Sequence, residues 1–309
     1  MKKVISTMLI YVLSIFFLFT RYPLIVNATI NIDTSCSLTL EYQHGEKKFN
    51  DLDIKIIRVA EISEDGTYSM INDFSKYPIN IDGISSQKEW NLIASTLSAY
   101  VYANKIPSTQ IQKTNNSGVV SFNTLQTGLY LVLPVNFETS TEIYTFDAFL
   151  ISLPNNSKSD TLVYDVIAKP KSKVYENKSN DIEYKVVKHW KDNGYVNQRP
   201  KDIQVDILKN GIIETTQTLS SKNNWSYSWK SPNDGSIWQV VERNVPNNYT
   251  VTSVNNGTTI IITNTYNYNN ENPPNTGNTA NLSLYITIMG IVGVFFIILG
   301  VNGKRKNYE

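Results

Sequence analysis

Residues 180–268 alternate between apolar and polar side chains with a period of two, and this pattern constrains the fold more than any other part of the sequence. A period of two places successive side chains on opposite faces of a β-strand. One row of the first segment consists of Ile182, Tyr184, Val186, Lys188 and Trp190. Similar segments follow at 203–207, 225–229, 238–242 and 260–265, with turn residues such as Asn210-Gly211 between them. Short strands separated by such turns predict a β-sandwich.

Two charged residues lie in the apolar rows of these strands. Lys188 is in step with Val186, and Glu242 is in step with Trp238 and Val240. A buried charge without a partner is strongly destabilising, so the pair requires an explanation. One interpretation is a salt bridge in or at the edge of the core. The other is that burial keeps the lysine neutral and the glutamate protonated, so that the amine attacks a neighbouring Asn amide, releases ammonia and leaves an isopeptide bond.

A set of short motifs in this region resembles the B-type repeat of the staphylococcal collagen adhesin, a domain found across Gram-positive surface proteins and pilins. The matching segments are Lys188–Asp192, Arg199-Pro200, Asn210-Gly211, Asn224–Tyr227, Trp238–Glu242, Val245-Pro246, Tyr249 and Ile262–Tyr266. The resemblance implies an isopeptide bond with Lys188 as nucleophile, Asn264 as acceptor amide and Glu242 as the proton-shuttling acid. Lys185 is the alternative nucleophile, because some family members place the lysine earlier, but the alternation favours Lys188. Such a bond would join the first and last strands and stabilise the fold by roughly 4 to 5 kcal/mol, by analogy with a disulfide loop.

The preceding region, 29–174, combines strand patterns with one helix. Ser86 and Glu89 form a capping-box motif, and apolar residues at helical spacing follow until shortly before Pro107. Strands are expected at 37–42, 54–60, 118–122, 128–133, 144–154 and 163–170. The Gly-x-x-x-Phe-x-x-Leu-x-x-Gly-x-Tyr pattern at 118–130 resembles the N-terminal domain of Gram-positive pilin subunits. Pro134 stands where a B-type repeat would place its glutamate, so no isopeptide bond is expected here.

The fold class that follows is mostly β: two tandem β-sandwich domains of immunoglobulin-like, CnaB type, at 29–174 and 180–268, the first with an inserted α-helix. Residues 1–28 combine Lys2 and Lys3 with an apolar run and predict a signal peptide, with an uncleaved membrane anchor as the alternative. Residues 282–309 begin with an apolar run long enough to cross a bilayer and end in a basic tail. Positive charge stays on the cytoplasmic side, so the body is expected to face outward.

The linker at 269–281 contains the pentapeptide Pro273-Pro274-Asn275-Thr276-Gly277. The order of pentapeptide, apolar helix and basic tail resembles the LPXTG cell-wall sorting signal of Gram-positive bacteria, from which Pro273 departs at the leading Leu. The resemblance implies a sortase that cleaves between Thr276 and Gly277 and joins Thr276 to peptidoglycan or to another pilin subunit. The protein would be held in the membrane before sorting. The alternative is a plain C-terminal anchor.

Backbone pilins carry a linking lysine in a Tyr-Pro-Lys-Asn motif, to which the stretch Ala168–Ser172 is partly similar. Lys171 is therefore a candidate for linkage between subunits. The alternative is a basic hinge between the domains, because 170–180 is polar and rich in Lys and Ser.

Composition argues against nucleic-acid binding and against most catalytic chemistry. A formal charge of +1 leaves no electrostatic basis for binding a phosphate backbone. One cysteine cannot form an intrachain disulfide, and no metal or other cofactor is expected. Cys36 is expected to be a buried strand residue. His44 is expected to be solvated in a charged turn, and His189 to face outward.

The expected function is that of a wall-anchored surface protein, either a pilin subunit or an adhesin, rather than an enzyme. The alternatives are a membrane-anchored secreted enzyme and a stalk protein without isopeptide chemistry. No loop of the sequence marks a host or surface ligand.

Overall fold

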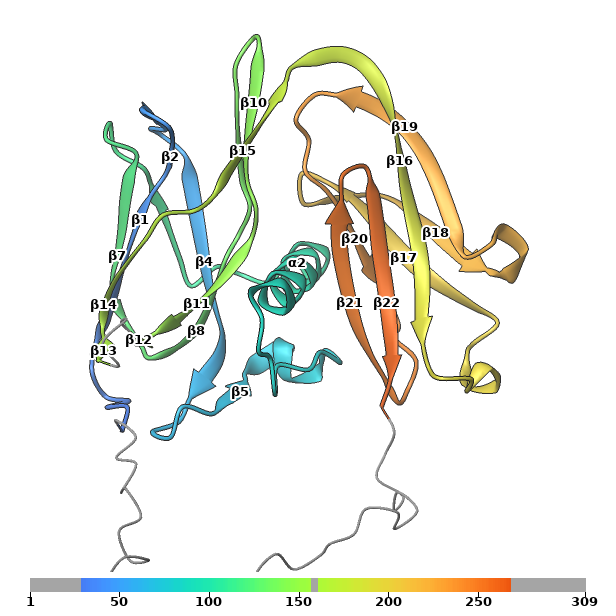
Figure 1. Ribbon diagram of the computed structural model, residues 1–309, viewed down its shortest axis with the longest axis horizontal. Coiled ribbons are helices and arrows are strands. Elements are labelled where there is room, and N and C mark those ends of the chain that lie inside the picture. Colours follow the sequence, from blue (N-terminus) through green and yellow to red (C-terminus); the bar gives the residue numbers. More distant parts are fainter. Residues whose placement is uncertain (1–28, 157–160, 268–309) are drawn as a thin grey trace, which may run out of the picture. The chain divides into compact units, whose positions relative to one another are not determined.

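The alternating segments of the C-terminal region form two β-sheets, as the sequence pattern predicts (Figure 1). The computed structural model describes residues 29–156 and 161–267, which belong to one compact unit. The expected signal peptide, sorting linker and C-terminal span lie outside the described residues. One sheet has the order β19-β16-β22-β21, with β16 Lys178–Lys191, β19 Ser226–Asn233, β21 Tyr249–Asn256 and β22 Thr259–Tyr266. The other has the order β18-β17-β20, with β17 Asp202–Lys209, β18 Ile212–Ser220 and β20 Trp238–Glu242.

The first and last strands of this sandwich are neighbours. Strand β16 pairs with β22 in parallel, so that Lys188 lies opposite Ile262 and Trp190 lies opposite Asn264. The expected turn between β17 and β18 is present: Asn210 and Gly211 have φ values of 51° and 78°. Two successive residues with positive φ are typical of a tight hairpin turn. Trp225 was expected to begin a strand, but it lies in the turn after the 3-10 helix η3 (Ser221–Asn223), with φ of 53°.

The N-terminal region contains three principal sheets, which are described by their strand orders. The first has the order β14-β1-β7, with β1 Cys36–Glu41, β7 Val119–Leu125 and β14 Asp165–Ala168. The second has the order β11-β8-β4-β5, with β6 also paired to β4: β4 Asp53–Ile62, β5 Tyr68–Met70, β6 Gln110–Lys113, β8 Gly128–Val132 and β11 Phe149–Leu153. The third has the order β15-β10-β9, with β9 Val135–Glu138, β10 Glu142–Phe146 and β15 Ser172–Glu176. Short elements complete the chain: β2 Gln43–His44, β3 Lys47–Lys48, η1 Asn72–Lys76, β12 Asn155–Asn156, β13 Leu162–Val163 and η2 Val196–Gln198.

The predicted helix is α2, Gln87–Asn104, and its capping box is present. Ser86 Oγ accepts a hydrogen bond from the Glu89 backbone N–H at 3.2 Å, and Glu89 Oε2 accepts one from the Ser86 backbone N–H at 3.0 Å. The helix buries more than the one expected stripe, because small residues on its other sides are buried as well: Ala94, Thr96, Ser98 and Ala99. A helix that is buried on several sides must pack against more than one neighbour.

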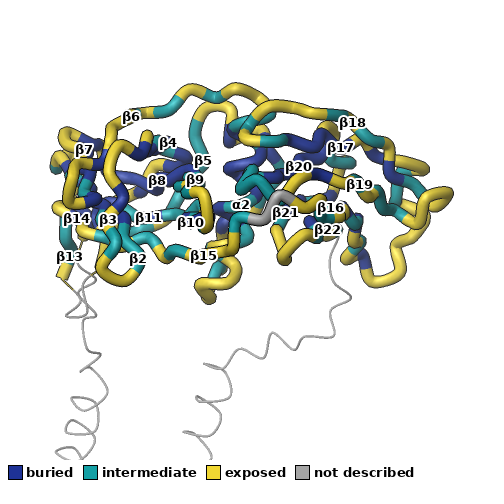
Figure 2. Tube along the Cα trace, turned by 90° about the horizontal axis from the view of Figure 1, so that it is seen from above, coloured by how far each residue is buried: buried dark blue, intermediate teal, exposed yellow. Residues whose placement is uncertain are grey.

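The buried residues form two clusters. One cluster lies between β1, β7 and parts of β4 and β8, and contains Leu38, Phe49 and Phe122. The other surrounds α2 and includes residues from both regions, such as Leu129 and Val240. Figure 2 shows that β8 and β20 are buried along their lengths. Helix α2 contacts β11 of the N-terminal region and β20 and β21 of the C-terminal sandwich (Figure 1).

Two local expectations need correction. The segment 170–180, read as linker-like, contains the strand β15, which pairs with β10 from Ser172 to Glu176. The expected strand at 144–154 is interrupted and becomes β10 and β11. Within residues 29–156 and 161–267, no helix is both long enough and apolar enough to cross a bilayer.

Candidate functional site

Three strands bring Lys188, Glu242 and Asn264 together inside the C-terminal sandwich. They come from β16, β20 and β22 respectively. Lys188 Nζ lies 3.5 Å from Glu242 Oε2, and both side chains are fully buried. Asn264, also fully buried, donates a hydrogen bond from Nδ2 to Glu242 Oε1 at 3.0 Å. The structure thus brings the three sequence-predicted residues into one cluster, with Glu242 in contact with both of the others.

Aromatic side chains enclose the amine of this cluster. Lys188 Nζ lies 4.0 Å from the centre of a Trp190 ring and donates a hydrogen bond to the His189 carbonyl at 3.2 Å. Trp190 in turn packs edge-on against Trp225 and Tyr249, with ring centroids 5.2 and 5.3 Å apart. Apolar rings around a charge remove the water that would otherwise stabilise it.

Burial shifts both ionisable groups toward their neutral forms. Desolvation lowers the pKa of Lys188 to about 8, against the opposing attraction of the Glu242 carboxylate. Desolvation also raises the pKa of Glu242, against the opposing effects of Lys188 and Asn264. These opposite shifts make proton transfer from the Lys188 ammonium to the Glu242 carboxylate easier than it would be in water, and a nucleophilic attack requires the neutral amine that this transfer produces.

Two acceptor atoms of the cluster remain without a hydrogen bond: Glu242 Oε2 and Asn264 Oδ1. A buried acceptor without a donor is destabilising. A protonated Glu242 could donate to Oδ1 if the amide of Asn264 rotated by half a turn, because a protonated carboxyl group is a donor whereas a carboxylate only accepts. That contact would polarise the amide carbonyl.

The alternative nucleophile, Lys185, is exposed and lies opposite Thr259. Its side chain is on the other face of β16 from Lys188, because the two residues are an odd number of positions apart. It therefore lies outside the buried cluster.

A second charged pair borders the cluster, and sequence reasoning missed it. Asp192 is buried, and its carboxylate accepts hydrogen bonds from Arg199 Nε at 2.5 Å and Nη2 at 2.8 Å. The Tyr249 hydroxyl lies 3.5 Å from Asp192 Oδ2. Asp192 belongs to the same alternating row as Lys188 and Trp190, so the sequence pattern carried a signal for its burial.

The remaining candidates lie elsewhere. Lys171 is exposed between β14 and β15. Thr276 and Gly277 lie outside the described residues. Cys36 is buried in β1, as expected, and burial raises the pKa of its thiol to about 11. His189 is exposed, as expected.

His44 was expected to be solvated, and this was wrong. It is half-buried, its Nδ1 lies 2.8 Å from Ser172 Oγ, and its ring packs edge-on against Tyr144 at 5.4 Å. The strand β15, which the sequence pattern did not indicate, brings Ser172 to it. Across the described part of the chain, no group of three or more His, Cys, Asp and Glu side chains is arranged to hold a metal ion.

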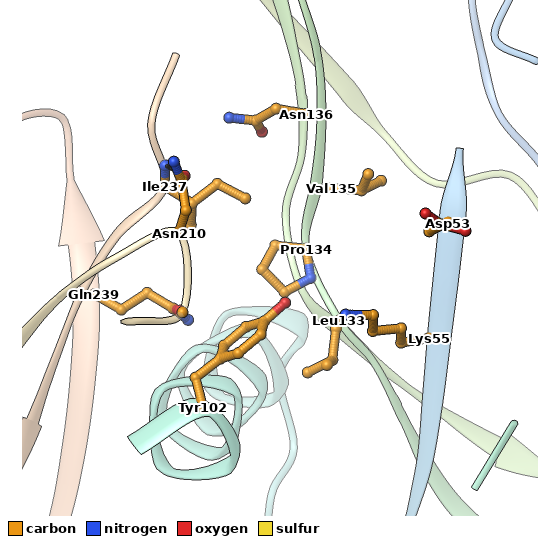
Figure 3. A pocket seen from close by; sticks show the side chains of 11 residues that line it. Asp53, Lys55, Tyr102, Leu133, Pro134, Val135, Asn136, Asn210, Ile237 and Gln239 are labelled. Atoms are coloured by element: carbon orange, nitrogen blue, oxygen red, sulfur yellow. Dashed lines mark hydrogen bonds between the residues drawn. The ribbon is translucent and has the colours of Figure 1, made fainter. Parts of the chain in front are cut away.

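A cavity of about 270 Å³ lies apart from the cluster, at the contact between α2 and the N-terminal end of β20 (Figure 3). Tyr102 on α2 stands between Gln239 on one side and Leu133 on the other. The lining residues are Asp53, Lys55, Tyr102, Leu133, Pro134, Val135, Asn136, Asn210, Gly211, Ile237 and Gln239. Lys188, Glu242 and Asn264 are absent from this lining, so the cavity gives no access to them.

Three solved structures of surface and pilus proteins resemble the chain. A single B repeat unit of the collagen-binding surface protein Cna of Staphylococcus aureus is 15% identical, with 76% of this chain and 100% of that chain covered, at a TM-score of 0.27. The shaft pilin SpaA from Lactobacillus rhamnosus GG is 14% identical, with 75% and 98% covered, at a TM-score of 0.27. The major pilin SpaD from Corynebacterium diphtheriae is 16% identical, with 77% and 66% covered, at a TM-score of 0.31.

No curated protein sequence matches the chain. The family match is of a different kind, because it rests on the sequence of one defined region. Residues 184–265, which span the strands from β16 to β22, match the family described as Cna protein B-type domain. The C-terminal sandwich is thus the part of the chain that is similar to the Cna protein B-type domain.

Proposed function

We propose that this protein is a pilin-like or adhesin-like surface protein of a Gram-positive bacterium, whose C-terminal domain is crosslinked by an isopeptide bond between Lys188 and Asn264. The observation that supports the bond most directly is the buried cluster itself: an amine, a carboxyl group and an amide, with Glu242 in contact with the other two. The match of 184–265 to the Cna B-type family supports the surface role. A buried ion pair with no other role would contribute little to stability, because the cost of removing both charges from water offsets their attraction.

The proposed reaction starts with transfer of a proton from the Lys188 ammonium to Glu242. The neutral Nζ then attacks Cγ of Asn264, while the protonated carboxyl group polarises the amide carbonyl. Glu242 takes one proton from Nζ and gives one to Nδ2. The bond between Cγ and Nδ2 breaks, ammonia leaves, and the bond between Nζ and Cγ remains. No oxidant or cofactor takes part in these steps.

The position of the bond gives it a mechanical role. Strands β16 and β22 are parallel neighbours, so a force applied at residue 178 and at residue 266 shears them past each other. A covalent tie from Lys188 to Asn264 carries that force across the sheet directly. The segment between these two residues, which holds most of both sheets, then bears no load.

Intact-mass spectrometry of the full-length chain tests the bond. The loss of one ammonia lowers the mass by about 17 Da. The Lys188→Met, Glu242→Gln and Asn264→Ala variants should not lose ammonia, so each should have the full mass calculated from its sequence. Lys185→Met is the matched control, because it removes an exposed lysine of the same strand and leaves the mass loss intact. An unshifted mass in the parent protein would reject the proposal.

Sorting is tested separately, by fractionating a Gram-positive host that expresses a sortase. We propose cleavage between Thr276 and Gly277 and linkage of pilin subunits through Lys171. Thr276→Ala should keep the protein in the membrane fraction, and Lys171→Arg should abolish high-mass polymers without releasing the protein from the cell. Polymers that persist in Lys171→Arg would assign linkage to another lysine.

A further inference from the structure

Strand β20, which carries Glu242, is buried on both faces. Trp238, Val240 and Glu242 alternate with Gln239 and Val241, and all five residues are buried. Gln239 faces helix α2 of the N-terminal region, because its Nε2 donates a hydrogen bond to Ser98 Oγ at 2.8 Å. Strand β20 is also the edge strand of its sheet. The N-terminal region therefore covers the outer face of this edge strand, on which Gln239 lies.

The other sheet ends in β21, and the N-terminal region covers this edge too. The Val251 backbone N–H donates to the Pro78 carbonyl at 2.9 Å, and the Ser253 backbone N–H donates to Thr96 Oγ1 at 2.7 Å. Ser253 Oγ in turn donates to the Val240 carbonyl of β20 at 2.8 Å. The two edges thus meet beneath α2, and backbone groups that would need water find protein partners instead.

Tyr77 closes the same side near Glu242. It is buried, stacks on Tyr100 with ring centroids 3.9 Å apart, and belongs to the same apolar cluster as Val240 and Val251. Burial raises the pKa of Tyr77, and the nearby charge of Glu242 raises it further. Tyr77 therefore belongs to the part of the N-terminal region that packs on this side of the sandwich, and the next residue, Pro78, accepts the hydrogen bond from Val251.

We propose that Tyr77, Pro78 and helix α2 form the closing wall of the Lys188–Glu242–Asn264 cluster, so that the isopeptide bond forms efficiently only when the N-terminal region is folded against the C-terminal domain. The inference rests on the proposed function, since it concerns the same bond. Tyr77 is a positioning residue: it acts by excluding water from Glu242. The crosslink would then form only after both regions have folded, and it would stabilise the folded protein.

Water exclusion matters because the reaction uses the neutral pair. Opening the wall would raise the pKa of Lys188 and lower that of Glu242. Each unit of pKa change lowers the fraction of molecules that hold the neutral pair about tenfold. The charged and polar groups facing Glu242 are Lys188 from β16, Asn264 from β22 and Tyr77 from the N-terminal wall. The Asp192–Arg199 pair lies near Lys188, and its two charges shift the pKa of that lysine in opposite directions.

The test compares two buried tyrosines in the full-length chain. Tyr77→Leu opens the wall, whereas Tyr42→Leu makes the same substitution in the cluster around β1 and β7. Each protein is made by cell-free synthesis in detergent micelles, and ammonia loss is followed by intact mass in timed aliquots. We expect bond formation in Tyr77→Leu to be slower by about tenfold or more, for a pKa change of about one unit. Tyr42→Leu and Tyr77→Phe should react at close to the parent rate.

The pH profile separates water exclusion from a loss of stability. In the parent chain the rate should fall above about pH 8, where the loss of the Lys188 proton leaves the pair without the proton that Glu242 needs to act on the amide. In Tyr77→Leu this alkaline limit should move toward pH 10, because a hydrated lysine keeps its proton up to a higher pH. A purely structural defect would lower the rate without moving the limit.

Thr96→Val supplies a milder second variant of the same wall, in case Tyr77→Leu does not fold. Parent-like rates and pH profiles in both wall variants would overturn the inference and leave the proposed bond standing. Equal slowing in Tyr42→Leu would also overturn it, because the effect would then reflect stability alone. A parent chain without ammonia loss would instead reject the proposed function itself.

Discussion

The two buried clusters of this protein differ in what they contain. The cluster around β1 and β7 is built from aliphatic and aromatic side chains such as Leu38, Phe49 and Phe122. Among the described residues, every buried Lys, Asp or Glu lies between Lys188 and Glu242, in the C-terminal domain. Both regions fold as β-sheets, so buried charge is not a requirement of the architecture. The buried charges of the C-terminal domain are paired: Lys188 lies next to Glu242, and Asp192 pairs with Arg199.

Of the changes considered, removing the acceptor amide of Asn264 from the charged cluster should lower the unfolding free energy the most. Asn264→Ala prevents the proposed crosslink and restores 76 positions of chain to free movement in the unfolded state. By analogy with a disulfide loop, the unfolding free energy should fall by about 4 to 5 kcal/mol. Urea unfolding of the parent and the variant measures this difference. A change below about 1 kcal/mol, well under that loop entropy, would mean that no crosslink stabilises the parent.

The apolar cluster should respond to a purely steric change. Phe122 is fully buried, and Phe122→Ala leaves a cavity, so we expect a loss of about 3 to 5 kcal/mol in unfolding free energy. The loss of ammonia should be unaffected, because Phe122 belongs to the other cluster. Urea unfolding and intact mass on the same sample give both results. A parent-like stability would show that the site collapses around the smaller residue.

The unreacted charged pair should give the C-terminal domain a pH dependence of its own. Asn264→Ala keeps the free amine of Lys188, whose pKa burial lowers from 10.5 to about 8 in the folded protein. Between these values the unfolded chain binds more protons, so stability should rise with pH, by up to about 3 kcal/mol. The raised pKa of Glu242 acts oppositely: stability should fall as pH rises above about 4.5. The unfolding free energy should therefore be lowest at a pH between the fall caused by Glu242 and the rise caused by Lys188.

Thermal unfolding between pH 4 and pH 11 measures this profile. Adding Lys188→Met to Asn264→Ala should abolish the rise above pH 8, because the buried amine is gone. A rise that persists in the double variant would assign it to another group.

A smaller effect is expected where α2 joins the two regions. Thr96→Val removes the hydroxyl that accepts from the Ser253 backbone N–H and leaves that buried donor unpaired, at a cost of about 1 to 3 kcal/mol. Thr39→Val is the matched control, because its hydroxyl pairs with Ser121 on the surface. The control should change stability by less than about 0.5 kcal/mol. Equal effects in both variants would argue against a buried hydrogen bond at the contact.

Local patterns predicted much of the fold correctly. The capping box at Ser86 and Glu89 marked the start of α2, since it depends only on residues three apart. The alternation at 182–190 placed Lys188 inward and Lys185 outward, and the structure confirms both. The strand β15 was missed because its two hydrophobic residues, Val174 and Tyr175, are adjacent and exposed, so no alternating apolar row marks it.

The sequence by itself determined which faces of each strand are apolar, where the helix starts, and that Lys188 and Glu242 belong to buried rows, because these properties follow from spacings of two to four residues. Only the tertiary structure decided that three strands bring Lys188, Glu242 and Asn264 into contact, and that Thr96 and Ser98 of α2 are buried against β20 and β21. Sheet order and register set those contacts, and both depend on how segments far apart in the chain pack together.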